Sequence, residues 1–499
     1  MIGARWTGRV PAVGTLGAAF LLVLASSAPA RSQAVRELTV DECVRLGLAR
    51  NASLRAAGAD AAAARASYAQ VRAGRLPSVR AQGGYTRLSG NIPPVEFTLP
   101  GTDSTFVFQG VELNRYDAEL TVEQPLFTGL QLHHRVRAAA QEAEATALDA
   151  EQARADVALE IRRAFWNLVR ARGVRTSVEV AIGDVDAHVR DVRNRLSAGT
   201  VLTRDVLAAQ TRRSEVLLER VDADNAVRVG QLELNRLIGL PLTTAIRPVP
   251  GLAGEGGAIP LDAAGILPDT AGIPRDSTGI PLDSADLPLD TAGIRLDSAG
   301  TPAGAADVDR LTTEALAGRP QLGALAARVN ALGAQLRAAQ GARLPQISFV
   351  GRYIYSRPNP YFFMEPDRFH HTWELGLSAS WDLWTGGRIG AQAAEARARL
   401  QAAEARLADT REQVAVDVAR QRLEVRRAGE ALAAARGNVD AARESFRVAR
   451  QQFDEGAALS SDVLAAEQAY RRAQASQVGA TADYAIARAS LLDTLGRVW

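Results

Sequence analysis

The sequence has no lysine and a single cysteine, Cys43, and each shortage excludes a class of protein. One cysteine rules out a disulfide framework within the chain and any zinc or iron–sulfur cluster held by cysteines. The 58 basic residues, all arginine, are balanced by 56 acidic residues, so a net charge of +2 provides no basic surface for nucleic acid. The histidine pairs, His133 with His134 and His370 with His371, are adjacent and lack the i, i+4 spacing of helical zinc ligands. We therefore expect no cofactor and no metal site.

Long apolar runs are also scarce. In residues 1–34, Arg5 and Arg9 precede a short apolar stretch at 13–25, and small residues follow it. This order is typical of a secretory signal peptide. After residue 34 no apolar run reaches the roughly 18–20 residues of a transmembrane helix. An exported chain of this kind enters a membrane only as strands of a closed barrel, because open strand edges are not tolerated in lipid.

Internal repetition is the strongest signal in the chain. Arg75-Leu76-Pro77 returns as Arg343-Leu344-Pro345, and the tip sequence from Gly199 to Ala209 returns from Gly456 to Ala466. Each copy reads as a helix, a β segment, a long helix, a tight turn and a returning helix. We therefore divide the mature chain into a first structural repeat, 35–249, and a second, 307–499.

Residues 250–306 separate the two repeats. An aspartate recurs there every seven residues: Asp262, Asp269, Asp276, Asp283, Asp290 and Asp297. The period matches a coiled coil, but proline and glycine in nearly every unit exclude a helix. One acid per unit, without a glycine–aspartate cluster, argues against a calcium-binding repeat. We interpret the segment as a flexible or extended surface linker.

Two long stretches without proline, 126–240 and 367–499, are rich in strong helix formers. Their apolar residues recur at three- and four-residue steps, which indicates helices. A helix of about 70 residues would be about 105 Å long, and such lengths are typical of coiled coils and helical tubes.

The ends of these helices carry their own signals. Gly199 and Gly456 follow the last periodic residues, as C′ glycines do. Thr203 and Ser460 are suited to cap the returning helices of about 35 residues. Two aspartates fall in the first turn, where a carboxylate meets the positive helix end: Asp205 and Asp462.

The segments between the helices alternate with a period of two. From Trp373 to Leu383 every second residue is apolar, and 117–123 alternates in the same way. One face is apolar and the other repeatedly charged, as in outer-membrane strands around a wet lumen. Two hairpins give four strands, whereas about eight is the practical minimum for a barrel. The barrel must therefore be shared between chains, with eight strands in a dimer or twelve in a trimer.

With these features in place, the sequence resembles the TolC-type outer-membrane factor family of efflux and type I secretion channels. The resemblance is carried by the doubled Arg-Leu-Pro, by the segment 124–129 (Gln-Pro-Leu-Phe-Thr-Gly) that leads into a helix, and by the doubled tip sequence. It implies an α+β membrane protein and a homotrimer. Each chain would give four β-strands to a shared 12-stranded outer-membrane barrel, continuing into a long α-helical periplasmic tunnel. Two long and four shorter helices are implied per chain.

The resemblance also implies a functional site. In the family the helix tips form the periplasmic entrance and contact a membrane-fusion adaptor protein. The corresponding residues are Gly199, Thr200, Val201, Leu202, Gly456, Ala457, Ala458 and Leu459. The family's gate aspartates correspond to Asp462 and Asp205, and three copies of Asp462 would favour cations at the entrance. The family's second gate acid would fall at Ala465, and the arginine partner of Asp205 at Ala458, so both are absent. Helix capping alone also accounts for the two aspartates.

The expected function is passive export through the bacterial outer membrane, with a periplasmic extension and no enzymatic activity. The chain would be the exit duct of a tripartite efflux pump or a type I secretion system. Expected partners are two further copies, the adaptor, outer-membrane lipid and an inner-membrane transporter of RND, ABC or MFS type. Drug, heavy-metal and protein cargo all stay open, although two methionines count against a methionine-lined copper pathway. The alternative is a periplasmic coiled-coil scaffold without pore activity.

Overall fold

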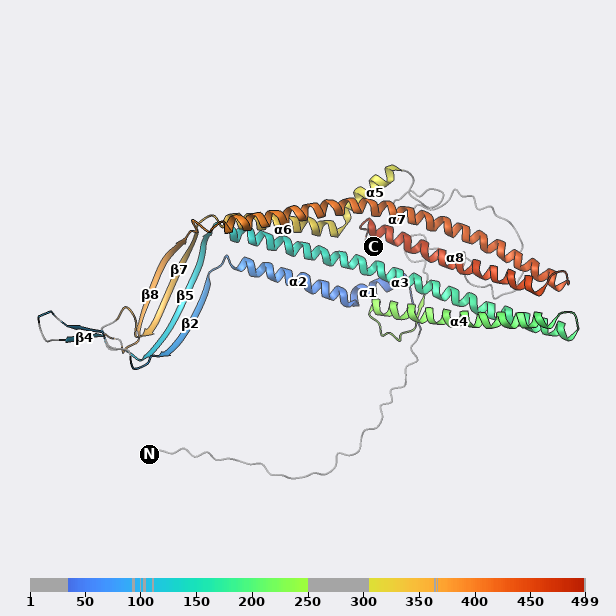
Figure 1. Ribbon diagram of the computed structural model, residues 1–499, viewed down its shortest axis with the longest axis horizontal. Coiled ribbons are helices and arrows are strands. Elements are labelled where there is room, and N and C mark those ends of the chain that lie inside the picture. Colours follow the sequence, from blue (N-terminus) through green and yellow to red (C-terminus); the bar gives the residue numbers. More distant parts are fainter. Residues whose placement is uncertain are drawn as a thin grey trace, which may run out of the picture.

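The computed structural model describes residues 35–91, 95–98, 100–101, 105–109, 112–249, 305–362, 365 and 367–497. The predicted signal peptide, 1–34, and all but the last two residues of the predicted linker, 250–306, lie outside these ranges. The described chain is elongated, with a β-sheet at one end and two helical hairpin tips at the other (Figure 1). No described helix is both long and apolar enough to cross a membrane.

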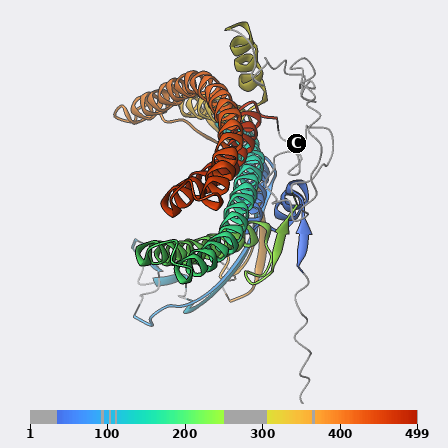
Figure 2. The same cartoon turned by 90° about the vertical axis from the view of Figure 1, so that its right-hand side faces the viewer.

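The long helices and their returning partners have the predicted lengths. Helices α3 (Gln131–Ser197) and α7 (Arg388–Asp454) each contain 67 residues. The returning helices α4 (Thr203–Ile238) and α8 (Ser460–Thr494) contain 36 and 35 residues. Each returning helix lies along its long helix, and α8 also contacts α3. The four helices thus form one curved layer in the order α4, α3, α8, α7 (Figure 2).

The expectation of four shorter helices is wrong, because the described residues form six. In addition to α4 and α8 these are α1 (Val40–Arg50), α2 (Ala52–Ala73), α5 (Ala305–Gly318) and α6 (Pro320–Gly341). The helix before each β segment is therefore broken into two.

Each break has a local cause. Asn51 is extended, and its Oδ1 accepts a 2.8 Å hydrogen bond from the backbone N–H of Ser53, which starts α2. Its Nδ2 donates to the Leu237 carbonyl at 3.0 Å, so the break is also fixed from α4. In the second repeat Pro320 occupies the first turn of α6, where its missing N–H costs least.

The four predicted strands form one antiparallel sheet in the order β2, β5, β7, β8. Their bounds are β2 (Ser78–Arg87), β5 (Asn114–Thr128), β7 (Gln346–Arg357) and β8 (His370–Ser380). Strand β8 ends before Trp381, so the alternation predicted as far as Leu383 continues past the strand. Two further pairs were not predicted: the hairpin of β3 (Val95–Thr98) with β4 (Thr105–Gln109), and the parallel pair of β1 (Arg36–Leu38) with β6 (Ile246–Pro248).

The register assigns opposite chemistry to the two faces of the sheet. One row of directly paired residues is apolar across all four strands: Ala81, Leu120, Tyr353 and Trp373. The adjacent row is polar: Arg80, Thr121, Arg352 and Glu374. Residues paired directly across a sheet share a face, and successive residues on a strand point to opposite faces. Arg352 forms ion pairs with Glu119 at 2.9 Å and Glu374 at 3.3 Å, so the charged face is linked across three strands.

Two separate apolar cores hold the middle of the molecule. The first gathers residues of α1, α3, α4 and β6, with Phe165 and Ile161 fully buried and Cys43 beside them. Burial raises the pKa of the Cys43 thiol to about 12, so it is an inert core residue. The second core gathers α5, α6, α7 and α8 around Val418 and Leu495. Each repeat therefore has its own core, and the hairpin tips project beyond both (Figure 1).

Candidate functional site at the hairpin tips

The turn between α3 and α4 and the turn between α7 and α8 lie at the same end of the molecule, opposite the sheet (Figure 1). Gly199 and Gly456 have φ of +76° and +77°, a left-handed conformation that favours glycine. At the first tip the Gly199 N–H donates to the Leu196 carbonyl and the Thr200 N–H to the Arg195 carbonyl, both at 3.0 Å. The second tip repeats this pattern. Both long helices therefore end in a Schellman motif, as the C′ glycines predict.

The aspartates predicted for the gate cap the returning helices. The Leu202 N–H donates to Asp205 Oδ2 and the Leu459 N–H to Asp462 Oδ2, each at 3.0 Å. The residues predicted as caps are wrong by one position, since Leu202 and Leu459 are the N-caps and Thr203 and Ser460 begin the helices. A leucine side chain offers no acceptor, so only one half of a capping box is present, in which the third-position carboxylate accepts the N–H of the N-cap residue.

The tip residues divide into a solvent-facing set and a packed set. Leu202 and Leu459 are 57% and 63% exposed despite being apolar. Val201 and Ala458 instead contact the cluster that joins the two tips, whose buried members are Val192, Val206, Phe453 and Val463. The remaining predicted tip residues are exposed: Gly199, Thr200, Gly456 and Ala457.

Arg195, which sequence reasoning missed, ties the two tips together. Its Nη1 donates to the Phe453 carbonyl at 2.9 Å, and its Nη2 donates to Asp454 at 3.0 Å. Its Nε donates to Asp191 on its own helix at 3.1 Å. A basic residue in the last turn of a helix is a weak capping signal, and nothing in the sequence shows that it reaches the other hairpin. The structure thus contains an arginine link between the tips, although position 458, where the family has an arginine, is an alanine.

A buried ionic network lies further from the tips, between α4 and α8. Glu467, 4% exposed, lies 2.9 Å from Arg471 Nε and 3.6 Å from Arg212 Nε. Arg471 also bonds Glu219 at 2.7 Å. Burial raises the pKa of Glu467, against the two arginines, and the nearby Asp184 carboxylate raises it further. This network links the two hairpins through ion pairs, whereas the cluster at the tips links them through apolar contacts.

A cavity of about 280 Å³ lies between α3, α7 and α8, directly behind the tips. His188 lines this cavity and shares a 2.9 Å hydrogen bond with the Ser460 hydroxyl. This hydroxyl therefore bonds α3 and does not cap α8. Burial lowers the pKa of His188, opposed by Asp191 and assisted by Arg450 and Arg195. Burial raises the pKa of Asp184, opposed by Arg450.

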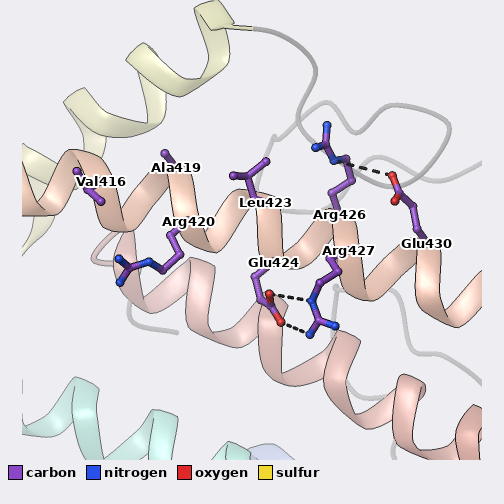
Figure 3. Close-up of a pocket in the computed structure, with 8 residues that line it drawn as sticks. All are labelled: Val416, Ala419, Arg420, Leu423, Glu424, Arg426, Arg427 and Glu430. Carbon is purple, nitrogen blue, oxygen red and sulfur yellow. Dashed lines mark hydrogen bonds and ion pairs between the residues drawn. The ribbon is translucent and has the colours of Figure 1, made fainter.

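A larger hollow, about 690 Å³, lies along α7 and is lined by residues of that helix alone (Figure 3). Val416 and Leu423 are exposed there. Glu424 forms an ion pair with Arg427, and Arg426 lies 3.9 Å from Glu430 (Figure 3). Because no second described element contributes to its wall, we regard it as an open edge of the helical layer and not as a ligand pocket. Within the described chain no three histidine, cysteine or acidic side chains gather as a metal site.

The sequence matches the family model described as Outer membrane efflux protein over residues 44–240 and 311–497. The chain belongs to the outer membrane efflux protein family. Each matched segment includes one hairpin tip, and the unmatched stretch between them covers the predicted linker. No curated protein matches the sequence.

The fold of this outer membrane efflux protein is similar to that of known channels. It matches the outer-membrane channel OprN with a TM-score of 0.69 and 19% identity, over 92% of this chain and 90% of that chain. It matches VceC of Vibrio cholerae with 0.67 and 18%, over 92% and 96%. It matches the open state of the MtrE channel of Neisseria gonorrhoeae with 0.66 and 19%, over 92% and 88%. The family and these neighbours are outer-membrane channels, which places this efflux protein in the bacterial outer membrane.

Proposed function

We propose that three copies of this efflux protein form a channel-tunnel that serves as the exit duct of a tripartite efflux pump or type I secretion system. The copies share a 12-stranded barrel in the outer membrane and a helical tunnel in the periplasm. The observation that carries the proposal is that both layers of the single chain end in open edges. Strands β2 and β8 have no outer neighbour among the described strands, and α4 and α7 bound the helical layer.

The two faces of the sheet support its place in the barrel. An open edge in lipid leaves backbone N–H and C=O groups without partners, so the sheet requires neighbours on both sides. Trp373, Leu375 and Leu377 are 64–70% exposed on the apolar face, which suits lipid. Arg352 and its two glutamates occupy the other face, which suits a wet lumen.

The edges of the helical layer support closure into a ring. Five apolar residues of α4 are exposed and spaced so that they fall on one helix face: Leu207, Leu218, Val221, Val229 and Leu232. The edge of α7 exposes Val416 and Leu423 beside the hollow of Figure 3. An exposed apolar stripe of this length marks an interface. The α4 edge of one copy meeting the α7 edge of the next is a head-to-tail contact, which forms a ring when the rotation between copies closes after three.

The tips form the periplasmic entrance in this proposal. Asp462 is exposed and fixed by its hydrogen bond to Leu459, so three copies would place three carboxylates around the axis. Such a ring constricts the entrance and favours cations. Asp205 has the same bond on the other hairpin and is proposed as a second acidic gate position.

The exposed leucines of the tips supply the adaptor contact. Leu202 and Leu459 offer apolar surface at the end of the molecule, and such side chains suit a partner's apolar tip. We propose the residues 199–202 and 456–459 as the contact for a membrane-fusion adaptor. The duct itself is passive. The inner-membrane transporter, of RND, ABC or MFS type, then supplies the energy and selects the cargo.

The deciding experiment is the oligomeric mass of the purified protein in detergent, followed by conductance after reconstitution. We expect a trimer that conducts weakly, with conductance rising several-fold in Asp462→Ala. Asp60→Ala removes the same charge from an exposed position on α2, far from the tips, and is expected to leave conductance unchanged. A soluble monomer or dimer without pores would overturn the proposal in favour of a coiled-coil scaffold. A trimer whose conductance is the same in the wild type and in Asp462→Ala would support the duct but contradict the gate role of Asp462.

A further inference from the structure

The cavity behind the tips has two kinds of wall. Phe446 and Phe453 of α7, Val463 and Leu464 of α8, and Val185 of α3 form its apolar part. The aromatic rings are held by neighbours: Phe446 stacks on Tyr470 with 6.2 Å between centroids. The cavity therefore has a preformed apolar surface contributed by both hairpins, which is what a small ligand requires.

The polar part of the wall carries more negative than positive charge. Asp184, Asp191, Asp454 and Glu467 line it, and Arg450 is the single arginine among the described lining residues. Two of the acids share one arginine, because Asp191 and Asp454 both bond Arg195.

The other two acids lack full compensation. Within the described residues Asp184 has no hydrogen bond and no ion pair within 4 Å, although Arg450 acts on it at longer range. Glu467 has its two ion pairs, yet both its carboxylate oxygens are buried and accept no hydrogen bond in the described part of the chain. Glu467 already lies between two arginines, whereas Asp184 is half-buried with no cation of the described chain within 4 Å. A cationic donor in this cavity is therefore favoured beside Asp184.

We propose that this cavity is a binding site for a small organic cation with an apolar aromatic body. The cationic group pairs with Asp184, beside Glu467, and the apolar body contacts Phe446 and Leu464. A volume of about 280 Å³ lies at the lower end of ligand pockets, roughly 300–1,000 Å³, so the ligand is compact. The site lies within one chain behind the tips, and so goes beyond the shared duct of the proposed function.

The position of the site gives binding a mechanical consequence. Residues of α3 form one wall, and residues of α7 and α8 form the other, so a bound cation contacts both hairpins. It adds to the link that Arg195 makes nearer the tips. A ligand that binds the joined arrangement more tightly than a separated one stabilises the joined arrangement.

The test is a fluorescence titration of the purified protein in detergent with proflavine, a small planar aromatic cation, at pH 7.5 and low salt. We expect saturable binding, at least ten-fold weaker in Asp184→Asn. Asp60→Asn makes the same charge change at an exposed position on α2 and is expected to bind like the wild type. Acridine, which keeps the ring system and is uncharged at this pH, is expected not to compete.

A second variant keeps the test decisive if Asp184→Asn fails to fold. Leu464→Trp fills the apolar wall without changing charge, and we expect it to abolish proflavine binding while the protein keeps its oligomeric mass. Equal affinity in the wild type, Asp184→Asn and Leu464→Trp would overturn the site, as would equal binding of acridine. Because binding is measured without a membrane, loss of the site and loss of pore activity are told apart.

Discussion

Arg195 in α3 lies over the ring of Phe453 in α7, with 4.2 Å from its guanidinium carbon to the ring centroid, and donates to that residue's own carbonyl at 2.9 Å. The last carbonyls of a helix have no partner within the helix. The Phe453 carbonyl accepts the Gly456 N–H of its own turn at 3.0 Å, and Arg195 adds a second hydrogen bond from the other hairpin. The end of α7 is thus tied to α3 as well as to its own turn, and the two tips are one structural unit.

Replacing Arg195 with alanine should loosen this unit. A hydrogen bond to a charged group contributes about 1.5–3 kcal/mol, and partial exposure of Arg195 places the expected loss near the lower value. Amide exchange at the end of α7 and the start of α8 should accelerate about ten-fold, since each 1.4 kcal/mol is a factor of ten. The matched control is Arg193→Ala, an exposed arginine on the same turn region. Equal exchange in both variants would contradict the link.

Replacing Gly199 or Gly456 with alanine should destabilise the protein only because of the backbone conformation at these positions. A Cβ added at Gly199 or Gly456 meets no atom within 4 Å, so no clash contributes. The left-handed conformation should cost about 1–2 kcal/mol for alanine. Gly183→Ala is the control, since Gly183 lies inside α3 with equally open space and alanine there should stabilise by about 1 kcal/mol. Thermal unfolding should shift in opposite directions for the tip variants and the control.

Asp184 should lower stability at neutral pH. Burial raises its pKa above the ordinary 3.8, so the protonated form is favoured in the folded state. The stabilising contribution of the protonated Asp184 side chain is therefore fully present below pH 3.8, and it is lost as the pH rises through the raised pKa. Asp184→Asn should raise the apparent Tm at pH 7.5, and the difference should vanish towards pH 4. A difference that grows on acidification would reverse the assigned cause.

The exposed stripe of α4 should be needed for assembly. A glutamate at Leu218, which is 68% exposed in the single chain, would place a charge in the proposed contact with the α7 edge of the next copy. We expect Leu218→Glu to run as a monomer in mild detergent by light scattering. Leu242→Glu introduces the same charge at an exposed leucine beyond the end of α4 and should stay trimeric. Trimeric Leu218→Glu would move the interface elsewhere.

Features that depend on neighbours in sequence could be predicted. The long helices, their glycine ends and the alternating strands follow from local periods and from the conformational freedom of glycine, and the structure has them where expected. The first-turn aspartates also follow, because Asp205 and Asp462 bond backbone three residues earlier. The sequence pattern places each N-cap one residue too late, because a hydroxyl suits either position, and in the structure His188 bonds the hydroxyl of Ser460.

The sequence by itself determined the repeat, the helix and strand types, and the apolar and charged faces, because each depends on residues a few positions apart. Only the tertiary structure decided that β5 pairs with β7 across the two repeats, and that Asn51 breaks a helix by binding Leu237. It alone brought Arg195 to the carbonyl of Phe453, 258 positions away. Such contacts depend on how the two cores orient the hairpins, and no local pattern of residues encodes that orientation.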